Sequence, residues 1–241
     1  MADKLLRKLF VANFTYSRKF ALRNTVRRLL ATRANACSST DGNVSFVTKD
    51  CTLEELEKLQ DLVSGNLEVC EDFISAEEEN LLLKEIEPYL KRQKYQYDHW
   101  DGAIHGYRET EKSQWPVEIL RIFKKMKDTA FSPGTKLLPR VHGLDLAPNG
   151  YIKPHIDSVK FCGSTIAGLS LLSSSVMRFV HKEHNTVMVD TLLPARSMYI
   201  IRNAVRYEFT HEVLSDEMSY WRGEHILRDR RISVILRNQP E

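Results

Sequence analysis

The sequence lacks the long hydrophobic runs of a membrane-spanning protein and the cysteine pattern of a disulfide-rich or zinc-binding one. A helix needs roughly 20 consecutive apolar residues to cross a bilayer, and no stretch of this chain supplies them. The four cysteines form no C-x-x-C pair and are widely spaced, as Cys37, Cys51, Cys70 and Cys162. This spacing predicts neither a zinc site nor a disulfide framework and is typical of a reducing compartment.

Acidic side chains are almost absent from the first 40 residues, where nine Lys or Arg stand against the single acid Asp3. The whole chain has 35 basic and 32 acidic residues, so 26 and 31 remain beyond residue 40, a net charge of −5. The basic segment alternates arginine with Leu, Phe and Val and has no uninterrupted apolar core. We therefore predict a mitochondrial transit peptide over residues 1–40 and a location in the mitochondrial matrix. A disordered basic arm is the alternative.

The rest of the chain has the composition of a globular protein, with 42% hydrophobic and 28% charged residues overall. Residues 34–50 are rich in Ser, Asn, Asp and Gly, which predicts a linker, so that 41–66 would hold a linker and a short helix. Two capping boxes and a proline at a first helical position predict three helices in the first half. These helices are predicted over residues 52–63, 75–90 and 116–131.

From residue 136 onward the pattern changes to short apolar runs separated by turns. Eight runs at this spacing predict a closed or double-sheet β fold, so the fold class is α+β and mainly β. A further strand is possible over residues 67–73. The eight predicted strands are Leu137–Ala147, Tyr151–Asp157, Ile166–Leu172, Val176–His181, Thr186–Leu193, Met198–Arg202, Val205–Thr210 and Arg231–Arg237.

A candidate metal site lies on two of these runs. His155 and Asp157 are two residues apart, which points both side chains to one face of a strand. His211 comes much later, next to another apolar run. Two imidazoles and one carboxylate are the usual ligand set of non-haem Fe(II) oxygenases. Arg231 and Arg237 share one face of the last strand, and a guanidinium is well suited to hold a carboxylate.

The order His-x-Asp, then His, then Arg-x-Ser-x-x-x-Arg resembles the AlkB-like Fe(II)/2-oxoglutarate-dependent dioxygenases. The resemblance covers about Leu59 to Pro240 and is carried most clearly by Tyr97–Asp101, Gly150–Asp157 and Thr165–Leu172. It implies a domain over residues 67–241 with a double-stranded β-helix (jelly roll) core and N-terminal buttressing helices. It also implies Fe(II) as cofactor, with 2-oxoglutarate as cosubstrate and O2.

The resemblance assigns roles residue by residue. His155, Asp157 and His211 would be the iron ligands, and Arg231 would bind the distal carboxylate of 2-oxoglutarate. Arg237 would assist the cosubstrate or orient a ligand. Ser233, on the same face as Arg231, would donate a hydrogen bond, and Tyr199 would contact 2-oxoglutarate or belong to the core. The remaining histidines are predicted to be ordinary, and Asp145 is a candidate for an acid that supports a ligand histidine.

Three functions remain open from the sequence. The first is a mitochondrial dioxygenase acting on a protein, and the resemblance implies roles in alkylation-induced programmed necrosis and fatty-acid metabolism. The second is a demethylase of N-methylated mitochondrial RNA, and the third is a largely non-catalytic regulator of cell death. The net acidic domain makes duplex DNA an unlikely partner. Residues 95–115 are either a candidate substrate surface, where RNA bases could stack on Tyr95, Tyr97, Trp100 and Tyr107, or a polar-edged strand and loop.

Overall fold

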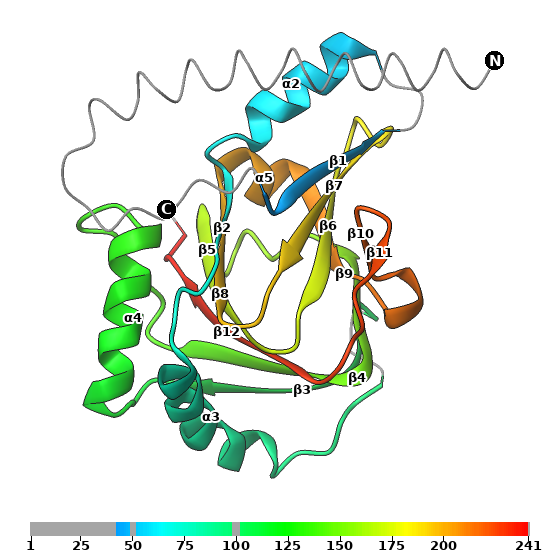
Figure 1. Ribbon diagram of the computed structural model, residues 1–241. Coiled ribbons are helices and arrows are strands. Elements are labelled where there is room, and N and C mark those ends of the chain that lie inside the picture. Colours follow the sequence, from blue (N-terminus) through cyan, green and yellow to red (C-terminus); the bar gives the residue numbers. More distant parts are fainter. Residues whose placement is uncertain (1–41, 49–51, 98–101, 241) are drawn as a thin grey trace. The chain divides into compact units, whose positions relative to one another are not determined.

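A curled antiparallel sheet of ten strands forms the core of the described chain (Figure 1). The computed structural model describes residues 42–48, 52–97 and 102–240. Neighbouring strands follow the order β1-β7-β6-β9-β4-β12-β5-β8-β2, and β3 pairs with β4. The strands of this sheet are β1 (Val44–Thr48), β2 (Leu67–Cys70), β3 (Ile104–Lys112), β4 (Val141–His155), β5 (Thr165–Leu172), β6 (Ser175–His181), β7 (Val187–Leu193), β8 (Ser197–Arg202), β9 (Phe209–Val213) and β12 (Arg231–Arg237).

The long strand β4 connects the two halves of the curled sheet. Its first part pairs with β12, and its last part pairs with β9. The register shifts between Ile152 and His155, which bends the strand from one half of the sheet to the other. The predicted jelly-roll core, mainly β with buttressing helices, is confirmed by this arrangement.

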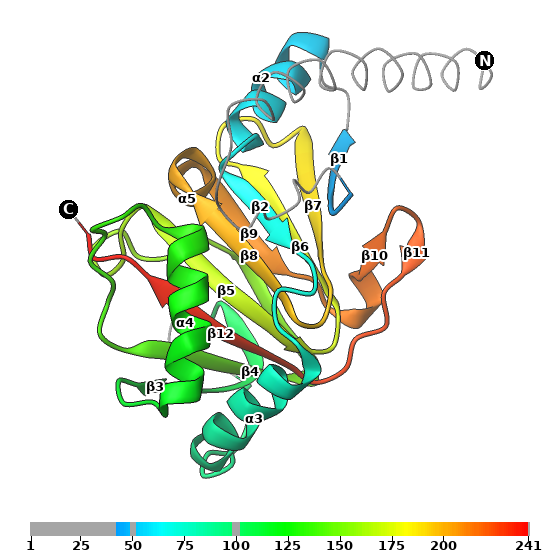
Figure 2. The ribbon, with the colours of Figure 1, turned by 60° about the vertical axis from the view of Figure 1, so that its left-hand side comes forward.

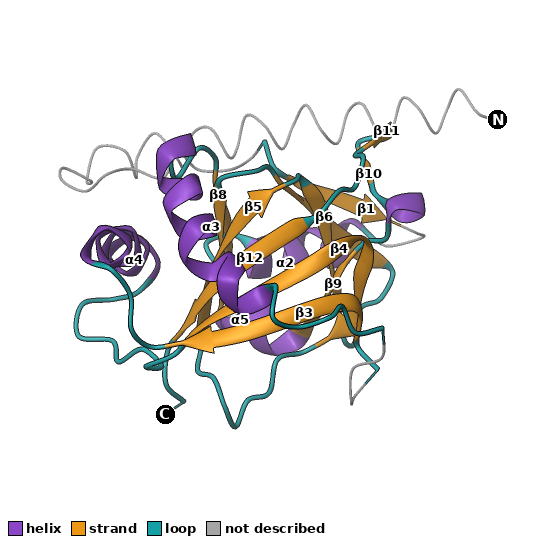
Figure 3. Ribbon diagram, turned by 90° about the horizontal axis from the view of Figure 1, so that it is seen from below, coloured by secondary structure: helices purple, strands orange, loops and turns teal. Residues whose placement is uncertain are grey.

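Helices α3 (Ala76–Leu90) and α4 (Val117–Ala130) pack on the outer face of the sheet (Figures 2 and 3). Strand β12 shows the alternation that this packing requires. Ile232, Val234 and Leu236 join the helices in one buried cluster, whereas Ile235 belongs to a second cluster inside the curl. Burying a side chain of this size contributes about 1.5–3 kcal/mol. The inner face therefore carries Arg231 and Ser233 of the same strand.

The predicted helix starts are confirmed. The side chains of Thr52 and Ser75 each accept a backbone N–H three residues on, in complete capping boxes that begin α2 (Leu53–Val63) and α3. Helix α4 begins directly after Pro116. These caps satisfy N–H groups that no helical carbonyl can reach, which is why the local sequence predicts them well.

Two strand predictions differ from the structure. The runs Leu137–Ala147 and Tyr151–Asp157 merge into the single strand β4, which begins at Val141 and ends at His155. The run Val205–Thr210 is instead helix α5 (Asn203–Glu208) followed by β9. Buried positions in this run are Val205, Arg206 and Phe209, a helical rather than an alternating spacing. Periodicity alone cannot assign a short apolar run to a helix or a strand, and most of this run is helical.

The predicted linker is also partly wrong, because residues 44–48 within it form β1. This strand pairs with β7 along its whole length, and such pairing overrides a loop-like composition. The expectation that no cysteine forms a disulfide is wrong for Cys70, which is disulfide-bonded, since sequence spacing does not show which thiols meet after folding. Cys162 is a buried free thiol. Among the described residues, no helix is long and apolar enough to cross a membrane.

Residues 214–230 connect β9 to β12 and carry a short 3-10 helix and a small hairpin. The hairpin packs through Trp221 on Val176 and Leu214, in a minor cluster apart from the two main ones. These elements are η1 (Asp216–Met218), β10 (Tyr220–Trp221) and β11 (Glu224–His225).

Candidate metal centre

Three elements bring the predicted metal ligands together. His155 is the last residue of β4, and Asp157 follows it in the loop toward β5. His211 lies in the middle of β9, and the register of the sheet sets it directly opposite His155. Residues 56 positions apart in the sequence therefore meet because β4 and β9 are neighbours.

The side chains of these three residues converge. The Nε2 atom of His155 lies 3.3 Å from Oδ1 of Asp157, and Nε2 of His211 lies 3.7 Å from the same oxygen. The two imidazole centroids are 4.3 Å apart. One ligand atom from each residue lies within 4.8 Å of the others, a spacing that could hold one metal ion. Nδ1 of His155 hydrogen-bonds the carbonyl of Lys153 at 2.9 Å, which leaves Nε2 directed toward the cluster.

The electrostatic environment keeps His211 and Asp157 in the protonation states that bind metal. Burial, together with the neighbouring His155, lowers the pKa of His211 to about 3, so its imidazole is neutral at physiological pH. Burial alone would raise the pKa of Asp157. The hydrogen bond with His155 and the positive charge of Arg237 outweigh burial and hold that pKa well below its usual range. A neutral imidazole and an ionised carboxylate are the ligand forms that metals require.

Arg231 is buried on the same inner face, with 1% of its surface exposed. Its Nε donates to Oγ of Ser170 at 3.0 Å, and its Nη1 donates to Oγ of Ser233 at 3.2 Å. Nη2 has no acceptor among the described residues, and no ion pair of that part of the chain includes Arg231. Burial lowers the pKa of this guanidinium. A buried cation without an anion is costly, so the position fits the carboxylate of a ligand.

Tyr199 lies beside Arg231 because Gly168 leaves room for it. Tyr199 on β8 and Gly168 on β5 are cross-strand neighbours. A Cβ atom on Gly168 would lie 2.3 Å from the tyrosine hydroxyl. Tyr199 is 4% exposed, and its hydroxyl interacts electrostatically with the guanidinium of Arg231. Burial raises the pKa of its hydroxyl, so it stays protonated and can donate to an anion.

Arg237 connects the metal cluster to an open cavity. Its Nε lies 3.3 Å from Oδ2 of Asp157, and its Nη1 lies 3.2 Å from Nδ1 of His142. The cavity has a volume of about 200 Å³ and is lined by Glu111, Leu138, Pro139, Arg140 and Arg237. The predicted proximity of Arg237 to the ligands is therefore observed.

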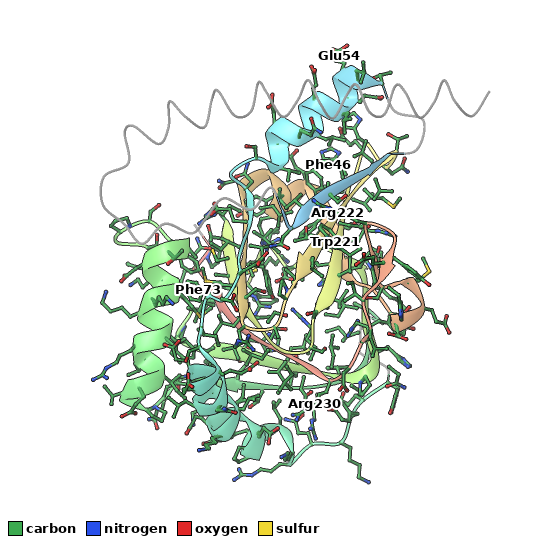
Figure 4. All side chains as sticks on the ribbon, viewed as in Figure 1. Phe46, Glu54, Phe73, Trp221, Arg222 and Arg230 are labelled. Atoms are coloured by element: carbon green, nitrogen blue, oxygen red, sulfur yellow. The ribbon has the colours of Figure 1, made fainter. Side chains whose placement is uncertain are left out.

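Asp145 does not support a ligand histidine. It lies on the outer, helix-facing side of β4, fully buried, and its carboxylate accepts from Arg108 at 2.8 Å, Arg230 at 2.9 Å and Tyr95 at 3.1 Å. The alternation of β4 explains this, because the neighbouring Leu144 and Leu146 occupy the inner face. Arg230, labelled in Figure 4, also pairs with Glu87 of α3.

The candidate substrate surface is only partly available for stacking. Tyr107 lies in β3 and is 3% exposed. Tyr95 is covered by the guanidinium of Arg108, 4.4 Å above its ring. Tyr97 is half exposed and makes an edge contact with His105, which lies outside the metal cluster. His99 and Trp100 lie outside the described residues.

Sequence reasoning missed two residues near the centre, Arg206 and Cys162. Arg206 is 2% exposed on α5, and its charge contributes to lowering the pKa of His211. No signal in the sequence indicated this, because a single arginine in a short apolar run is usually a surface residue.

Comparisons with known proteins agree with the fold and the cluster. No protein-family model matches the chain. The structure of OsALKBH1 matches with a TM-score of 0.53 at 12% identity, covering 71% of this chain and 97% of that one. A Pseudomonas putida prolyl-4-hydroxylase matches with a TM-score of 0.52 at 13% identity, covering 76% and 97%. At such low identity these matches show the fold alone, which is the jelly roll of 2-oxoglutarate oxygenases.

The sequence comparison is more specific. The chain is 56% identical over 169 residues to the protein named "Alpha-ketoglutarate-dependent dioxygenase alkB homolog 7, mitochondrial" of Bos taurus, covering 70% of this chain and 76% of that one. It is 56% identical over 170 residues to the Mus musculus protein of the same name, with the same coverage. The chain belongs to this AlkB homolog 7 family and is a dioxygenase that depends on 2-oxoglutarate, the other name of alpha-ketoglutarate.

Proposed function

We propose that this dioxygenase holds Fe(II) with His155, Asp157 and His211 and acts on a protein in mitochondria. The observation that carries the proposal is the shared inner face of β4, β9 and β12. His155, His211 and the guanidinium of Arg231, which is buried without a carboxylate partner among the described residues, lie on this face. Asp157, in the loop after β4, brings a carboxylate oxygen within 4.8 Å of the ligand atoms of both imidazoles.

The donor set fits Fe(II). Two imidazoles and one carboxylate are the ligand set of non-haem Fe(II) oxygenases and would hold the ion from one side. Bound iron, together with 2-oxoglutarate and O2, supplies an oxidation that converts 2-oxoglutarate to succinate and CO2 and hydroxylates a C–H bond of the substrate. The chain's own residues hold and orient the reactants and keep water from the buried side of the site.

Arg231 would bind the distal carboxylate of 2-oxoglutarate. Its unpartnered Nη2 and the nearby hydroxyls of Ser233 and Tyr199 provide donors for an anion in a site that excludes water. Arg237 would orient Asp157, since its Nε lies 3.3 Å from that carboxylate, and would add positive charge on the cosubstrate side.

A protein substrate is favoured over RNA by the surface around the site. Two of the four aromatic residues considered for base stacking, Tyr95 and Tyr107, are held inside contacts of the fold. The chain beyond residue 40 carries a net charge of −5, which opposes phosphate binding. Demethylation of N-methylated mitochondrial RNA is the second candidate, supported by the half-exposed ring of Tyr97. Duplex DNA is disfavoured by the same net charge.

A mitochondrial location is supported by the names of the relatives and by the basic segment over residues 1–40. We propose the matrix as the compartment. Roles in alkylation-induced programmed necrosis and in fatty-acid metabolism follow from the family resemblance. A non-catalytic regulator is less well supported, because the complete ligand set and Arg231 are all present.

The test of catalysis is succinate formation by the purified chain loaded anaerobically with Fe(II) and then exposed to O2. The unaltered chain is expected to convert 2-oxoglutarate, and Asp157→Ala is expected to abolish conversion while the fold is retained. His225→Ala is the matched control, since His225 lies in the β10–β11 hairpin outside the metal cluster. Normal succinate formation by Asp157→Ala would refute the metal assignment.

The test of substrate class compares mitochondria with and without the protein. Proteins gaining one oxygen atom only in its presence would support hydroxylation. Methylated transfer RNA that accumulates in its absence, with tight RNA binding that weakens steeply with salt, would favour the demethylase instead.

A further inference from the structure

The proposed ligand Asp157 does not lie in a strand, so the loop that carries it must be held by other contacts. The chain between β4 and β5 turns over residues 158–164. Val159 and Phe161 point outward, with 58% and 74% of their surfaces exposed. The inner side of this loop faces Arg206 of α5.

A single guanidinium group closes the loop from inside. Nη2 of Arg206 lies 3.3 Å from the carbonyl oxygen of Ser158, 3.4 Å from that of Cys162 and 3.0 Å from the thiol of Cys162. The thiol in turn donates to the Ser158 carbonyl at 3.3 Å. Arg206 therefore contacts both ends of the turn that begins directly after Asp157.

The same short segment positions the third ligand. Arg206 comes five residues before His211, and α5 runs directly into β9. The backbone N–H of Asn203 at the start of α5 donates to the carbonyl of Ser164 at 3.0 Å, where the loop ends. The position of α5 is thus shared by the Asp157 loop and by the strand of His211.

Arg206 makes these contacts at a high desolvation cost. It is 2% exposed, and no ion pair among the described residues includes it. Its Nε and Nη1 have no acceptor in that part of the chain. An apolar side chain would be cheaper to bury, whereas one guanidinium nitrogen, Nη2, here contacts two carbonyls and a thiol.

The opposite side of the loop is held by the C-terminal strand. The backbone N–H of Gly163 donates to the carbonyl of Asn238 at 2.9 Å, and the N–H of Thr165 donates to the Asn238 side chain at 2.8 Å. Asn238 directly follows Arg237, which contacts Asp157. The loop is therefore fixed between Arg206 and the segment after Arg237.

We infer that Arg206 is a positioning residue of the metal centre, which keeps the carboxylate of Asp157 at the distance from His211 that one metal ion requires. The inference rests on the proposed role of these residues as iron ligands. It assigns Arg206 no contact with 2-oxoglutarate, because its partners are all in the loop.

The test measures Mn(II) affinity by calorimetry for the full chain and three variants. Arg206→Met removes the guanidinium, Arg206→Lys keeps the charge but not the fork, and Arg121→Met is the control on the exposed face of α4. Loss of a group that orients a ligand weakens metal binding by about 10- to 100-fold, so we expect this for Arg206→Met and a smaller loss for Arg206→Lys. Arg121→Met should match the unaltered chain.

A second readout separates positioning from general damage. At saturating Mn(II), the 2-oxoglutarate dissociation constant of Arg206→Lys should stay within about twofold of the unaltered value, and its Co(II) absorption spectrum should change. Mn(II) affinity equal to the unaltered chain in both Arg206 variants would overturn the inference. So would a loss of 2-oxoglutarate affinity as large as the loss of metal affinity. If Arg206→Met does not fold, Arg206→Lys alone decides. Failure of the unaltered chain to bind Mn(II) would instead refute the proposed metal centre itself.

Discussion

At the scale of single residues, the site depends on buried charged side chains, some of which have oppositely charged partners and some of which do not. Asp157 is surrounded by two imidazoles and Arg237, whereas the side chains that accept hydrogen bonds from Arg231 within the described residues are the neutral hydroxyls of Ser170 and Ser233. Such an imbalance is unfavourable in a folded core unless a ligand completes it. The residues of the site are therefore arranged for binding at the expense of stability.

Arg231→Ala should weaken 2-oxoglutarate binding far more than metal binding. Removing one partner of a buried charge pair costs roughly 2–5 kcal/mol, and under the proposed function Arg231 would form this pair with the cosubstrate. Calorimetric titration of the Mn(II)-loaded variant with 2-oxoglutarate measures the effect, with Arg121→Ala as control. An unchanged 2-oxoglutarate affinity would place the carboxylate contact elsewhere.

Gly168→Ala should displace Tyr199 without touching any proposed ligand of the metal. The new Cβ would lie 2.3 Å from the tyrosine hydroxyl, so the ring or the strand must move. Overpacking of this kind costs about 1–3 kcal/mol of folding stability. We also expect weaker 2-oxoglutarate binding with Mn(II) affinity retained. Gly42→Ala is the control, because nothing lies within 4 Å of a Cβ there, and equal behaviour of the two variants would contradict the assigned position of Tyr199.

At the scale of elements, helix α3, strand β3 and strand β12 are joined through one carboxylate. Asp145 is fully buried and accepts from Arg108, Arg230 and Tyr95, while Arg230 also pairs with Glu87. This network lies on the outer, helix-facing side of the sheet, and its member Arg230 directly precedes Arg231 in the sequence. It holds in place the strands on which the candidate site is built.

Asp145→Asn should destabilise the fold strongly, because it leaves Arg108 without its counter-charge and removes one of the two carboxylates that pair with Arg230. Breaking a buried ion pair in this way costs about 3–5 kcal/mol. Urea unfolding monitored by circular dichroism gives the free-energy change. Asp128→Asn removes an exposed pair with Lys124 and should cost less than about 1 kcal/mol. Similar losses for both variants would show that the Asp145 network contributes little.

An element could be predicted from the sequence when the residues that determine it lie close together in the chain. The capping boxes of α2 and α3 are local, and both helices begin where predicted. Helix α5 was mistaken for a strand, because its short apolar run fits either period. Strand β1 was missed, since only its pairing with the distant β7 makes it a strand.

The candidate site shows the same division. His155 and Asp157 are marked by their spacing, and the match to a family motif identifies His211 and Arg231. The contribution of Arg206 arises only when α5 meets the loop after Asp157, and the role of Gly168 only when β5 pairs with β8. Contacts between segments that are distant in the sequence produce no periodic pattern in either segment, so the sequence alone does not predict them.

At the scale of the whole molecule, charge is divided along the chain. Nine basic residues and one acid lie in the first 40 positions, and the remainder carries a net charge of −5. The division suggests that targeting and catalysis belong to separate parts of the sequence.

Deleting residues 1–40 should leave a soluble, folded domain that no longer enters mitochondria. Cell fractionation of the tagged, truncated chain measures this, and residues 1–40 fused to a cytosolic reporter are the complementary control. Continued import of the truncated chain, or failure of the fusion to be imported, would refute the transit-peptide prediction.

The central claim is that one inner face binds both a metal ion and 2-oxoglutarate. The most direct measurement is the anomalous scattering of crystals grown with Mn(II) and 2-oxoglutarate under anaerobic conditions. We predict a single strong peak within bonding distance of His155, Asp157 and His211, with a 2-oxoglutarate carboxylate paired to Arg231. No peak among these three residues, or 2-oxoglutarate bound away from Arg231, would contradict the account.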